Sequence, residues 1–474
     1  MLAAMPSDLR FAREAWLSLA VGIGWFATAR GSALGLLFAV LPGVLLTASG
    51  AAQLLGLAEP RLRDLGAIGA LAGALFAFPS PALSFGVSAL LFGASLLAFV
   101  GVGSFTARTH EPADGIALPP RTAQLHAEIA LDQAIRGPML LLAPVASAAE
   151  HVRFARELGE AAALWRARGW HAQPASYHAA PPPAERISLA PRRTFGLAFE
   201  ELRFESGYAP HEGEPGRERW LGYAPNRLAW AWLLRSADPA RPWLLCLHGY
   251  QMGHPAIDLA VFRAESWRRR GWNVVLPVLP LHGPRRLGAV SGIGMFGADF
   301  LDSAHALAQT IWDVRRLIGW IRAQSDAEIA CYGLSLGGYC AALLASLAPE
   351  LDSVIAGVPA TDFSRIVWRH TPPVGRERLE HAGFSRGLAA EVLRPVSPLA
   401  LAPLVPHARR FVFGAPDDQF VSPDQVRDLL AHWGTPRHVW YPGAHLSFRA
   451  HAPVQQLLHE ALESRSRSLQ PREN

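Results

Sequence analysis

Residues 329–348 read IACYGLSLGGYCAALLASLA, and much of the architecture follows from this one segment. The apolar run 329–334 has the length of a buried strand, and the small residues 339–348 are typical of a buried helix. Between them Gly333-Leu334-Ser335-Leu336-Gly337 places a serine on a sharp turn, where a Cβ at the flanking positions would collide with the adjoining backbone. The segment therefore predicts a nucleophile elbow with Ser335 at its tip. The flanking strand and helix make this interpretation specific, since five-letter matches alone occur by chance.

Apolar runs and amphipathic stretches alternate on both sides of this turn, from about Phe195 onward. The apolar runs have strand length and are bounded by Pro or Gly; they cover residues 228–234, 243–247, 273–279, 329–334, 353–358, 410–413 and 438–441. Amphipathic stretches of helical length lie between them, at residues 258–270, 303–323 and 422–433. This alternation predicts βαβ units around a mostly parallel sheet, in which ligands bind at the carboxyl ends of the strands.

An elbow serine needs a general base and an acid that orients the base, in the chain order Ser, Asp or Glu, His. Asp417 and Asp418 follow one predicted strand, and His445 follows the next. We favour Asp418 as the acid because it lies three residues before Val421, which would begin the next packed turn. Asp417 is then a turn or helix-capping carboxylate. His445 is the expected base; the alternative is an exposed loop histidine, since the chain has 18 histidines.

The charge that develops on a substrate oxygen in such chemistry needs two preorganised N–H donors. Leu336, the residue after the serine, supplies one of them. The loop after the predicted strand 243–247 reads His248-Gly249-Tyr250-Gln251. We expect the backbone N–H of Tyr250 to be the second donor, with Gln251 as the alternative, and we expect His248 to hold this loop in place.

From about residue 195 to residue 465 the chain resembles the α/β-hydrolase fold superfamily. The resemblance is carried by His248-Gly249 with its following loop, Gly333-Leu334-Ser335-Leu336-Gly337-Gly338, Asp418 with Val421, and Gly443-Ala444-His445-Leu446. It implies the α/β-hydrolase fold, a mostly parallel sheet flanked by helices, with a triad of Ser335, His445 and Asp418. It further implies esterase, lipase, thioesterase or peptidase chemistry through an acyl-enzyme, which needs no metal or organic cofactor.

The expected activity is hydrolysis of a carboxylic ester or thioester, and two other classes remain as alternatives. One is a serine peptidase or amidase on the same triad, because the Gly337-Gly338 variant of the elbow also occurs in prolyl-oligopeptidase-like enzymes, although no propeller sequence is obvious. The other is a non-enzymatic, membrane-bound protein that keeps the hydrolase fold for binding. An intact nucleophile, acid and base count against the second alternative.

Two further segments bear on substrate choice. Arg285 and Arg286 follow a predicted strand, so that either could receive a carboxylate or phosphate of the substrate. Solvated arginines, or arginines paired with Asp299 or Asp302, are the ordinary alternative. The segment 361–394 occupies the place where this superfamily inserts a lid. Its large apolar side chains either line an acyl pocket or pack as a helix core: Phe363, Ile366, Val367 and Trp368.

Composition separates the N-terminal hundred residues from the rest of the chain. Of 474 residues 50% are hydrophobic and 18% are charged, so part of the chain is expected in lipid. Between residues 15 and 107 the only charged residues are Arg30, Glu59, Arg61, Arg63 and Asp64. The uncharged runs 32–58 and 82–107 exceed the roughly 20 helical residues that cross a bilayer. The shorter stretches 11–29 and 62–78 can also span if flanking charges snorkel.

Four such spans would turn at residues 30–31 and 79–81. The arginines that flank them would then share one side of the membrane, which the positive-inside rule makes cytoplasmic. A signal peptide is the alternative for the first segment, because Ala27-Thr28-Ala29 matches an A-x-A cleavage site. The large C-terminal part would end on the cytoplasmic side in both cases, whereas an odd number of spans without cleavage would place it outside.

These expectations divide the chain into a transmembrane region of about four spans (1–108), a helical and loop connection (109–195), a hydrolase domain (196–465) and a disordered tail (466–474). The expected partners are a small-molecule or lipid ester and the bilayer, and the oligomeric state is not specified. The net charge of +5 is small and the arginines are dispersed, so the sequence shows no basic patch for nucleic acid and we expect no nucleic-acid partner. Cys246, Cys331 and Cys340 lie in apolar surroundings, which predicts buried thiols.

Overall fold

The computed structural model describes residues 12–463, apart from residues 30, 31, 58, 81, 82, 110–112, 143–145, 237, 239 and 298. The chain divides into two compact units. The helical unit comprises residues 1–143, 415–423 and 440–454, and the sheet unit comprises residues 144–414, 424–439 and 455–474. The expected turn at residues 30–31, part of the expected turn at 79–81 and the expected tail at 466–474 lie outside the described residues.

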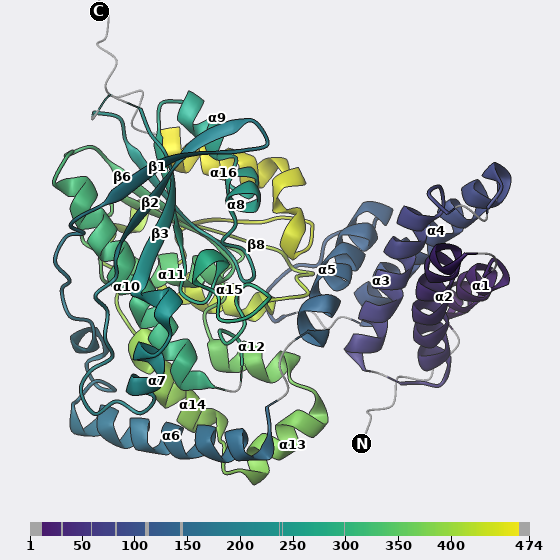
Figure 1. Cartoon of the computed structure of the whole chain (residues 1–474), viewed down its shortest axis with the longest axis horizontal. Helices are drawn as coiled ribbons and strands as arrows, with labels where there is room; N and C mark the ends of the chain where they lie inside the picture. The colour runs from purple at the N-terminus through teal and green to yellow at the C-terminus, as the bar shows by residue number, and fades with distance from the viewer. Residues whose placement is uncertain are drawn as a thin grey trace, which may run out of the picture. The chain divides into compact units, whose positions relative to one another are not determined.

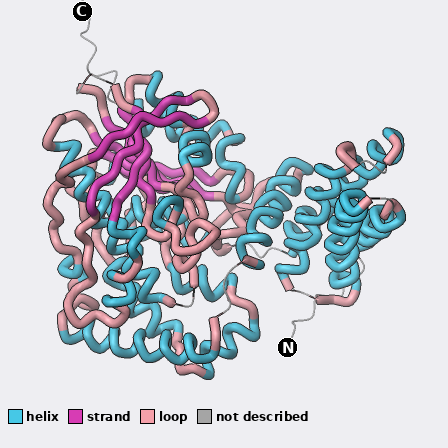
Figure 2. The backbone as a smooth tube through the Cα atoms, viewed as in Figure 1, coloured by secondary structure: helices cyan, strands magenta, loops and turns pink. Residues whose placement is uncertain are grey.

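The described residues form one sheet of nine strands (Figure 2). The strands are β1 (Ser188–Thr194), β2 (Leu197–Glu205), β3 (Leu228–Leu234), β4 (Trp243–Leu247), β5 (Asn273–Val278), β6 (Ile329–Leu334), β7 (Ser353–Gly357), β8 (Arg410–Gly414) and β9 (Arg437–Trp440). Their order is β1-β2-β3-β5-β4-β6-β7-β8-β9. The pairs from β5 through β4, β6 and β7 to β8 are parallel, and the pairs from β1 through β2 and β3 to β5 are antiparallel. This mixed α/β sheet with flanking helices is consistent with the α/β-hydrolase fold.

All seven predicted strands are confirmed to within one residue at either end. Strands β4, β5, β6 and β7 are buried along their whole length, because helices cover both faces of the sheet there. That burial explains why they read as unbroken apolar runs. The hairpin of β1 and β2 was not predicted. Its turn residues Phe195 and Gly196 both have positive φ, and a phenylalanine is not a recognisable signal for such a turn.

The helices after residue 144 are α6 (Ala148–Ala167), α7 (Arg217–Leu221), α8 (Pro255–Val261), α9 (Ala264–Arg269), α10 (Phe300–Arg322), α11 (Leu336–Leu344), α12 (Phe363–His370), α13 (Pro373–His381), α14 (Arg386–Leu393), α15 (Pro423–His432) and α16 (Ala452–Glu463). The segment 361–394 forms α12, α13 and α14. Helix α6 lies against α13 and α14 (Figure 1), where Trp165 Nε1 donates to Val392 O at 3.0 Å. The expected lid is therefore an ordered helical layer.

The helical unit contains α1 (Arg13–Ala27), α2 (Ala33–Leu54), α3 (Pro60–Phe76), α4 (Phe85–Thr109) and α5 (Ala123–Leu141). Polar contacts join several ends of these helices. Arg108 near the end of α4 pairs with Glu14 near the start of α1 at 2.5 Å. Arg63 near the start of α3 donates to Thr109 at 2.6 Å. The starts of α1 and α3 therefore lie beside the end of α4, so both run antiparallel to α4.

Two of these helices, α2 and α4, are long and apolar enough to cross a membrane. Helices also form at the other two expected spans, but α1 has 15 residues and α3 has 17, so the structure reduces four expected spans to two candidates. In α3 the charged residues Arg61, Arg63 and Asp64 belong to the first turns, which shortens its apolar part. Large apolar side chains of α2 and α4 are exposed, among them Leu36, Leu37, Val44, Leu90 and Leu97.

Candidate active site

Ser335 occupies the expected sharp turn between β6 and α11. Its backbone has φ 56° and ψ −114°, a strained conformation for a residue with a Cβ. A Cβ on Gly333 would lie 1.9 Å from Gly337 O, and a Cβ on Gly337 would lie 1.8 Å from Leu247 O. The expected collisions at the flanking positions are thus confirmed. From residue 329 to residue 348, Ser335 is the one residue that is not buried.

The loop after β4 lies beside Ser335. A Cβ added to Gly249 would be 3.6 Å from the Cβ of Ser335. Leu336 is the first residue of α11, so its N–H has no acceptor within the helix. Among the described residues, no backbone hydrogen bond uses the N–H of Tyr250 or of Leu336. Both N–H groups that the sequence proposed as oxyanion donors are therefore free to bind an oxygen.

His248 has the structural role that was expected of it. Its Nε2 accepts the N–H of Leu279 at 3.1 Å, so Nδ1 carries the proton and donates to Gly249 O at 2.8 Å. Burial lowers the pKa of His248 to about 4, which keeps the ring neutral. The imidazole therefore ties the loop after β4 to the end of β5.

Asp418 and His445, both in the helical unit, form a buried pair. Asp418 Oδ2 lies 2.6 Å from His445 Nδ1, and Asp418 Oδ1 accepts the N–H groups of Phe420 and Val421 at 2.8 Å each. Asp417 is also buried, but its carboxylate pairs with Arg121 at 2.6 Å. The structure thus brings together the expected acid and base and gives the competing aspartate another partner.

Opposing effects act on the imidazole of His445. Burial alone would lower its pKa, but the charge of Asp418 and the hydrogen bond that His445 donates to it, together with the charge of Asp132, raise the pKa above its usual value. The ring of Phe420 covers the imidazole at a centroid distance of 4.9 Å. A carboxylate on Nδ1 leaves Nε2 as the nitrogen that can accept a proton.

Helix α5 contributes contacts to this pair that the sequence did not reveal. Asp132 accepts the backbone N–H of His445 at 2.7 Å and that of Leu446 at 3.0 Å. The same carboxylate accepts the N–H of Gln419 at 3.2 Å. The sequence assigned this stretch no chemistry. An aspartate and an arginine four residues apart, Asp132 and Arg136, were the available signal, and that spacing is also ordinary for a solvated helix face.

The structure contradicts both expectations for Arg285. Its guanidinium is 1% exposed and pairs with Asp313 at 2.9 Å. It also donates to Val278 O at 3.0 Å and to Asn226 O at 3.1 Å. Arg286 is exposed and donates to Gly283 O. Arg285 is therefore a structural residue beneath the end of β5 and is not available to bind a substrate anion.

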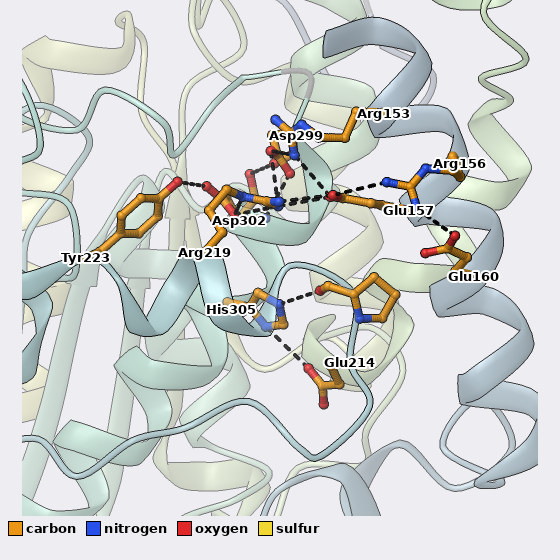
Figure 3. A network of polar contacts seen from close by, with 12 residues as sticks. Arg153, Arg156, Glu157, Glu160, Glu214, Arg219, Tyr223, Asp299, Asp302 and His305 are labelled. Atoms are coloured by element: carbon orange, nitrogen blue, oxygen red, sulfur yellow. Dashed lines mark hydrogen bonds and ion pairs between the residues drawn. The ribbon is translucent and has the colours of Figure 1, made fainter. Parts of the chain in front are cut away.

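Asp299 and Asp302 bind a different arginine, Arg219 (Figure 3). Arg219 also binds Glu157 of α6 at 3.0 Å, and Tyr223 donates to Asp302 at 2.6 Å. Because these groups come from α6, from α7 and the loop after it, and from the start of α10, the network holds α6 against α7 and α10 within the sheet unit. Among the described residues, no group of three or more His, Cys, Asp or Glu side chains has the arrangement of a metal site.

Three of the four apolar side chains of the expected lid pack as helix core, and the fourth, Trp368, is half-buried and stacks on Phe384. Phe363 of α12 is 1% exposed and stacks on Phe296 with centroids 4.5 Å apart. Phe296 in turn contacts Tyr250 edge-on at 4.7 Å. Ile366 and Val367 are buried as well. This aromatic row supports the loop that carries the expected oxyanion donor.

Comparisons with known proteins give two sequence relatives and a set of solved structures. No model of a known protein family matches the chain. The uncharacterized protein MT2702 of Mycobacterium tuberculosis strain CDC 1551 / Oshkosh is 41% identical over 341 residues, covering 70% of this chain and 81% of the relative. The uncharacterized protein Rv2627c of strain H37Rv is 40% identical over 341 residues, with the same coverage. The solved acetyl xylan esterase from Paenibacillus sp. R4 has a TM-score of 0.42 at 16% identity, covering 60% of this chain and 98% of that one. The chain belongs to the same family as the two mycobacterial proteins.

Proposed function

We propose that the protein is a membrane-associated serine hydrolase that cleaves a carboxylic ester or thioester through an acyl-enzyme. The observation that carries the proposal is the buried 2.6 Å contact between Asp418 Oδ2 and His445 Nδ1. The same chain has a strained elbow at Ser335, and Ser335 is the one residue between 329 and 348 that is not buried. An oriented histidine and an elbow serine are the two parts that activated-serine chemistry requires.

In the proposed reaction Ser335 Oγ attacks the carbonyl carbon of the substrate while His445 Nε2 takes the hydroxyl proton. Asp418 accepts the Nδ1–H and stabilises the imidazolium, and the N–H groups of Tyr250 and Leu336 bind the oxyanion. Collapse of the intermediate breaks the bond to the leaving group, which takes the proton from His445 as an alcohol or thiol. Water then attacks the acyl-enzyme with His445 as base, releasing the acid and restoring Ser335.

The membrane part of the proposal is supported by α2 and α4 and by their exposed leucines. It is also supported by the gathering of Glu14, Arg63 and Arg108 at one end of the helices. We propose that α1 and α3 cross the bilayer together with α2 and α4; four alternating crossings would return the chain to its starting side, which the positive-inside rule would make cytoplasmic. We propose that the catalytic residues lie on this side, where a bilayer concentrates lipid esters; a small soluble ester is the other substrate class.

The test is fluorophosphonate labelling of membranes that contain the full chain as wild type, Ser335→Ala or Ser176→Ala. Ser176 is an exposed serine in a short turn and serves as the matched control. The expected result is equal labelling of wild type and Ser176→Ala and loss of the label in Ser335→Ala. Equal labelling of Ser335→Ala would contradict the assignment of the nucleophile.

Substrates separate the reaction classes once labelling is established. Detergent-solubilised wild type is expected to hydrolyse short acyl esters and thioesters faster than aminoacyl amides, with no turnover by Ser335→Ala. Faster cleavage of the amides would support the peptidase alternative. Absence of both labelling and ester hydrolysis in folded wild type would favour the binding-protein alternative.

A further inference from the structure

Helix α5 binds the two loops that carry the acid and the base. We call residues 415–423 the acid loop and residues 440–454 the base loop; both belong to the helical unit. The carboxylate of Asp132 is fully buried and accepts three backbone N–H groups. Oδ2 binds the N–H of His445 at 2.7 Å and that of Gln419 at 3.2 Å, and Oδ1 binds the N–H of Leu446 at 3.0 Å. One side chain therefore joins the backbones of both loops.

The three donors are next to the proposed catalytic pair in the chain. His445 is itself the proposed base, and Gln419 directly follows the proposed acid, Asp418. Hydrogen bonds to a buried carboxylate are short and strong, and removing such an acceptor leaves buried N–H groups unpaired. Asp132 thus fixes the separation of the two loops at the positions from which the side chains of Asp418 and His445 extend.

Asp132 is part of a stripe on one face of α5, because positions four apart lie above one another on a helix. Glu128, four residues earlier, binds His451 of the base loop at 3.1 Å. Arg136, four residues later, donates to Gln419 O of the acid loop and pairs with Asp64 of α3 at 2.6 Å. The stripe therefore binds both loops, and its last residue connects the acid loop to α3.

We infer that Asp132 is a positioning residue of the proposed hydrolase: its carboxylate joins the acid loop to the base loop and so holds the His445 ring against Asp418. This inference rests on the proposed function. It extends that function by making the N-terminal helical region part of the catalytic apparatus.

The charge of Asp132 gives a readout that a purely structural role would not move. Burial and the nearby Asp418 raise the pKa of Asp132 to about 7, and its negative charge helps to raise the pKa of His445. Three further ion pairs lie at the two loops, Arg121 with Asp417, Arg136 with Asp64, and Glu128 with His451, and Arg449 of the base loop is exposed. Loss of the Asp132 charge should therefore lower the pKa of His445.

The experiment compares the full chain as wild type, Asp132→Asn and Glu128→Gln in detergent. Asp132→Asn keeps the size of the side chain but replaces one acceptor by a donor that faces N–H groups. We expect kcat for ester hydrolysis to fall by about 10²-fold, as for a displaced catalytic group, with KM unchanged. The acidic limb of the pH profile should move to lower pH in Asp132→Asn and stay in place in Glu128→Gln. The inference would be overturned if folded Asp132→Asn had the kcat and the acidic limb of wild type. It would also be overturned if the acidic limb moved equally in Asp132→Asn and Glu128→Gln.

A second variant and a second measurement keep the test informative. Asp132→Glu retains the charge, so its acidic limb should stay at the wild-type position; movement of its limb would count against the inference. NMR of ¹⁵N-histidine-labelled protein reports the Nδ1–H that His445 donates to Asp418. That signal should be present in wild type and shifted or lost in Asp132→Asn, and an unchanged signal would overturn the positioning role. Because this measurement needs no substrate, it separates failure of the inference from failure of the proposed hydrolase activity.

Discussion

Asp418 Oδ2 lies 2.6 Å from His445 Nδ1, whereas the neighbouring carboxylate of Asp417 pairs with Arg121 at 2.6 Å. Both carboxylates are buried, so each needs a protein partner to compensate for the loss of its hydration. Their different partners give the two aspartates different roles. One orients the proposed base, and the other fixes the loop to the chain segment just before α5.

Replacement of the two aspartates should therefore have unequal effects. In Asp418→Asn the amide no longer stabilises the tautomer with a proton on Nδ1, so Nε2 cannot act as the base. We expect kcat for ester hydrolysis to fall by about 10⁴-fold. In Asp417→Asn we expect a loss of less than about tenfold in kcat, because the hydrogen bond between Asp418 and His445 remains. If Asp417→Asn lost more activity than Asp418→Asn, the assignment of Asp418 as the acid would be wrong.

Arg121 provides the control for this comparison. If Asp417 acts only through its ion pair, Asp417→Asn and Arg121→Gln remove the same interaction. The double variant should then be about as stable and as active as either single variant, because the effects of two residues in direct contact are not additive. Full additivity of the two effects would show that Asp417 has a further role.

The pH dependence of hydrolysis follows from the pKa of His445. Although burial lowers this pKa, Asp418 and Asp132 raise it above the usual value of 6.5. The imidazole must be neutral to accept the serine proton, so activity should be lost as the pH falls through this raised pKa. We expect the acidic limb of kcat/KM to lie above pH 6.5 in wild type. His248 will not contribute to it, since burial lowers its pKa to about 4.

The elbow could be predicted from sequence because its chemistry is local. Backbone atoms leave no room for a Cβ at the glycines on either side of Ser335. The strand before the serine and the helix after it are continuous apolar segments. Asp418 could be distinguished from Asp417 for a related reason: its distance to Val421 is that of a local turn, and its carboxylate does accept the Val421 N–H.

Residues whose role depends on distant partners could not be predicted in this way. Asp132 binds the N–H of Gln419, which is 287 residues away in the chain, and no local pattern encodes that contact. Arg285 follows a strand end that suggested a substrate-binding loop, but its partner Asp313 lies 28 residues later, within α10. The sequence predicted only a helical and loop connection over residues 109–195, and no local pattern in it showed that the polar face of α5 is buried against two loops.

The elbow glycines should be intolerant of even one methyl group. In Gly337→Ala the added Cβ would lie 1.8 Å from Leu247 O, so β4 or the elbow must move. We expect a loss of about 1–3 kcal/mol or more in the free energy of unfolding. Gly159→Ala in α6 is the matched control, because nothing lies within 4 Å of its added Cβ; it should gain roughly 0.5–1 kcal/mol. Denaturant unfolding of the solubilised chain measures both, and a wild-type midpoint for Gly337→Ala would contradict the geometry.

The ion pair of Arg136 and Asp64 allows stability and catalysis to be separated. Both side chains are buried, so Arg136→Met leaves an unpaired carboxylate and should destabilise the helical unit by about 3–5 kcal/mol. Arg136→Met with Asp64→Leu removes both charges and should recover most of the thermal stability in detergent. Arg108→Met is the control, since its pair with Glu14 is partly exposed and should contribute less than about 1 kcal/mol. Arg136 also donates to Gln419 O, which the double variant does not replace. We therefore expect the double variant to be labelled by fluorophosphonate more slowly than wild type, even though its stability returns. If both the stability and the labelling rate recovered fully, Arg136 would affect the acid loop only through stability.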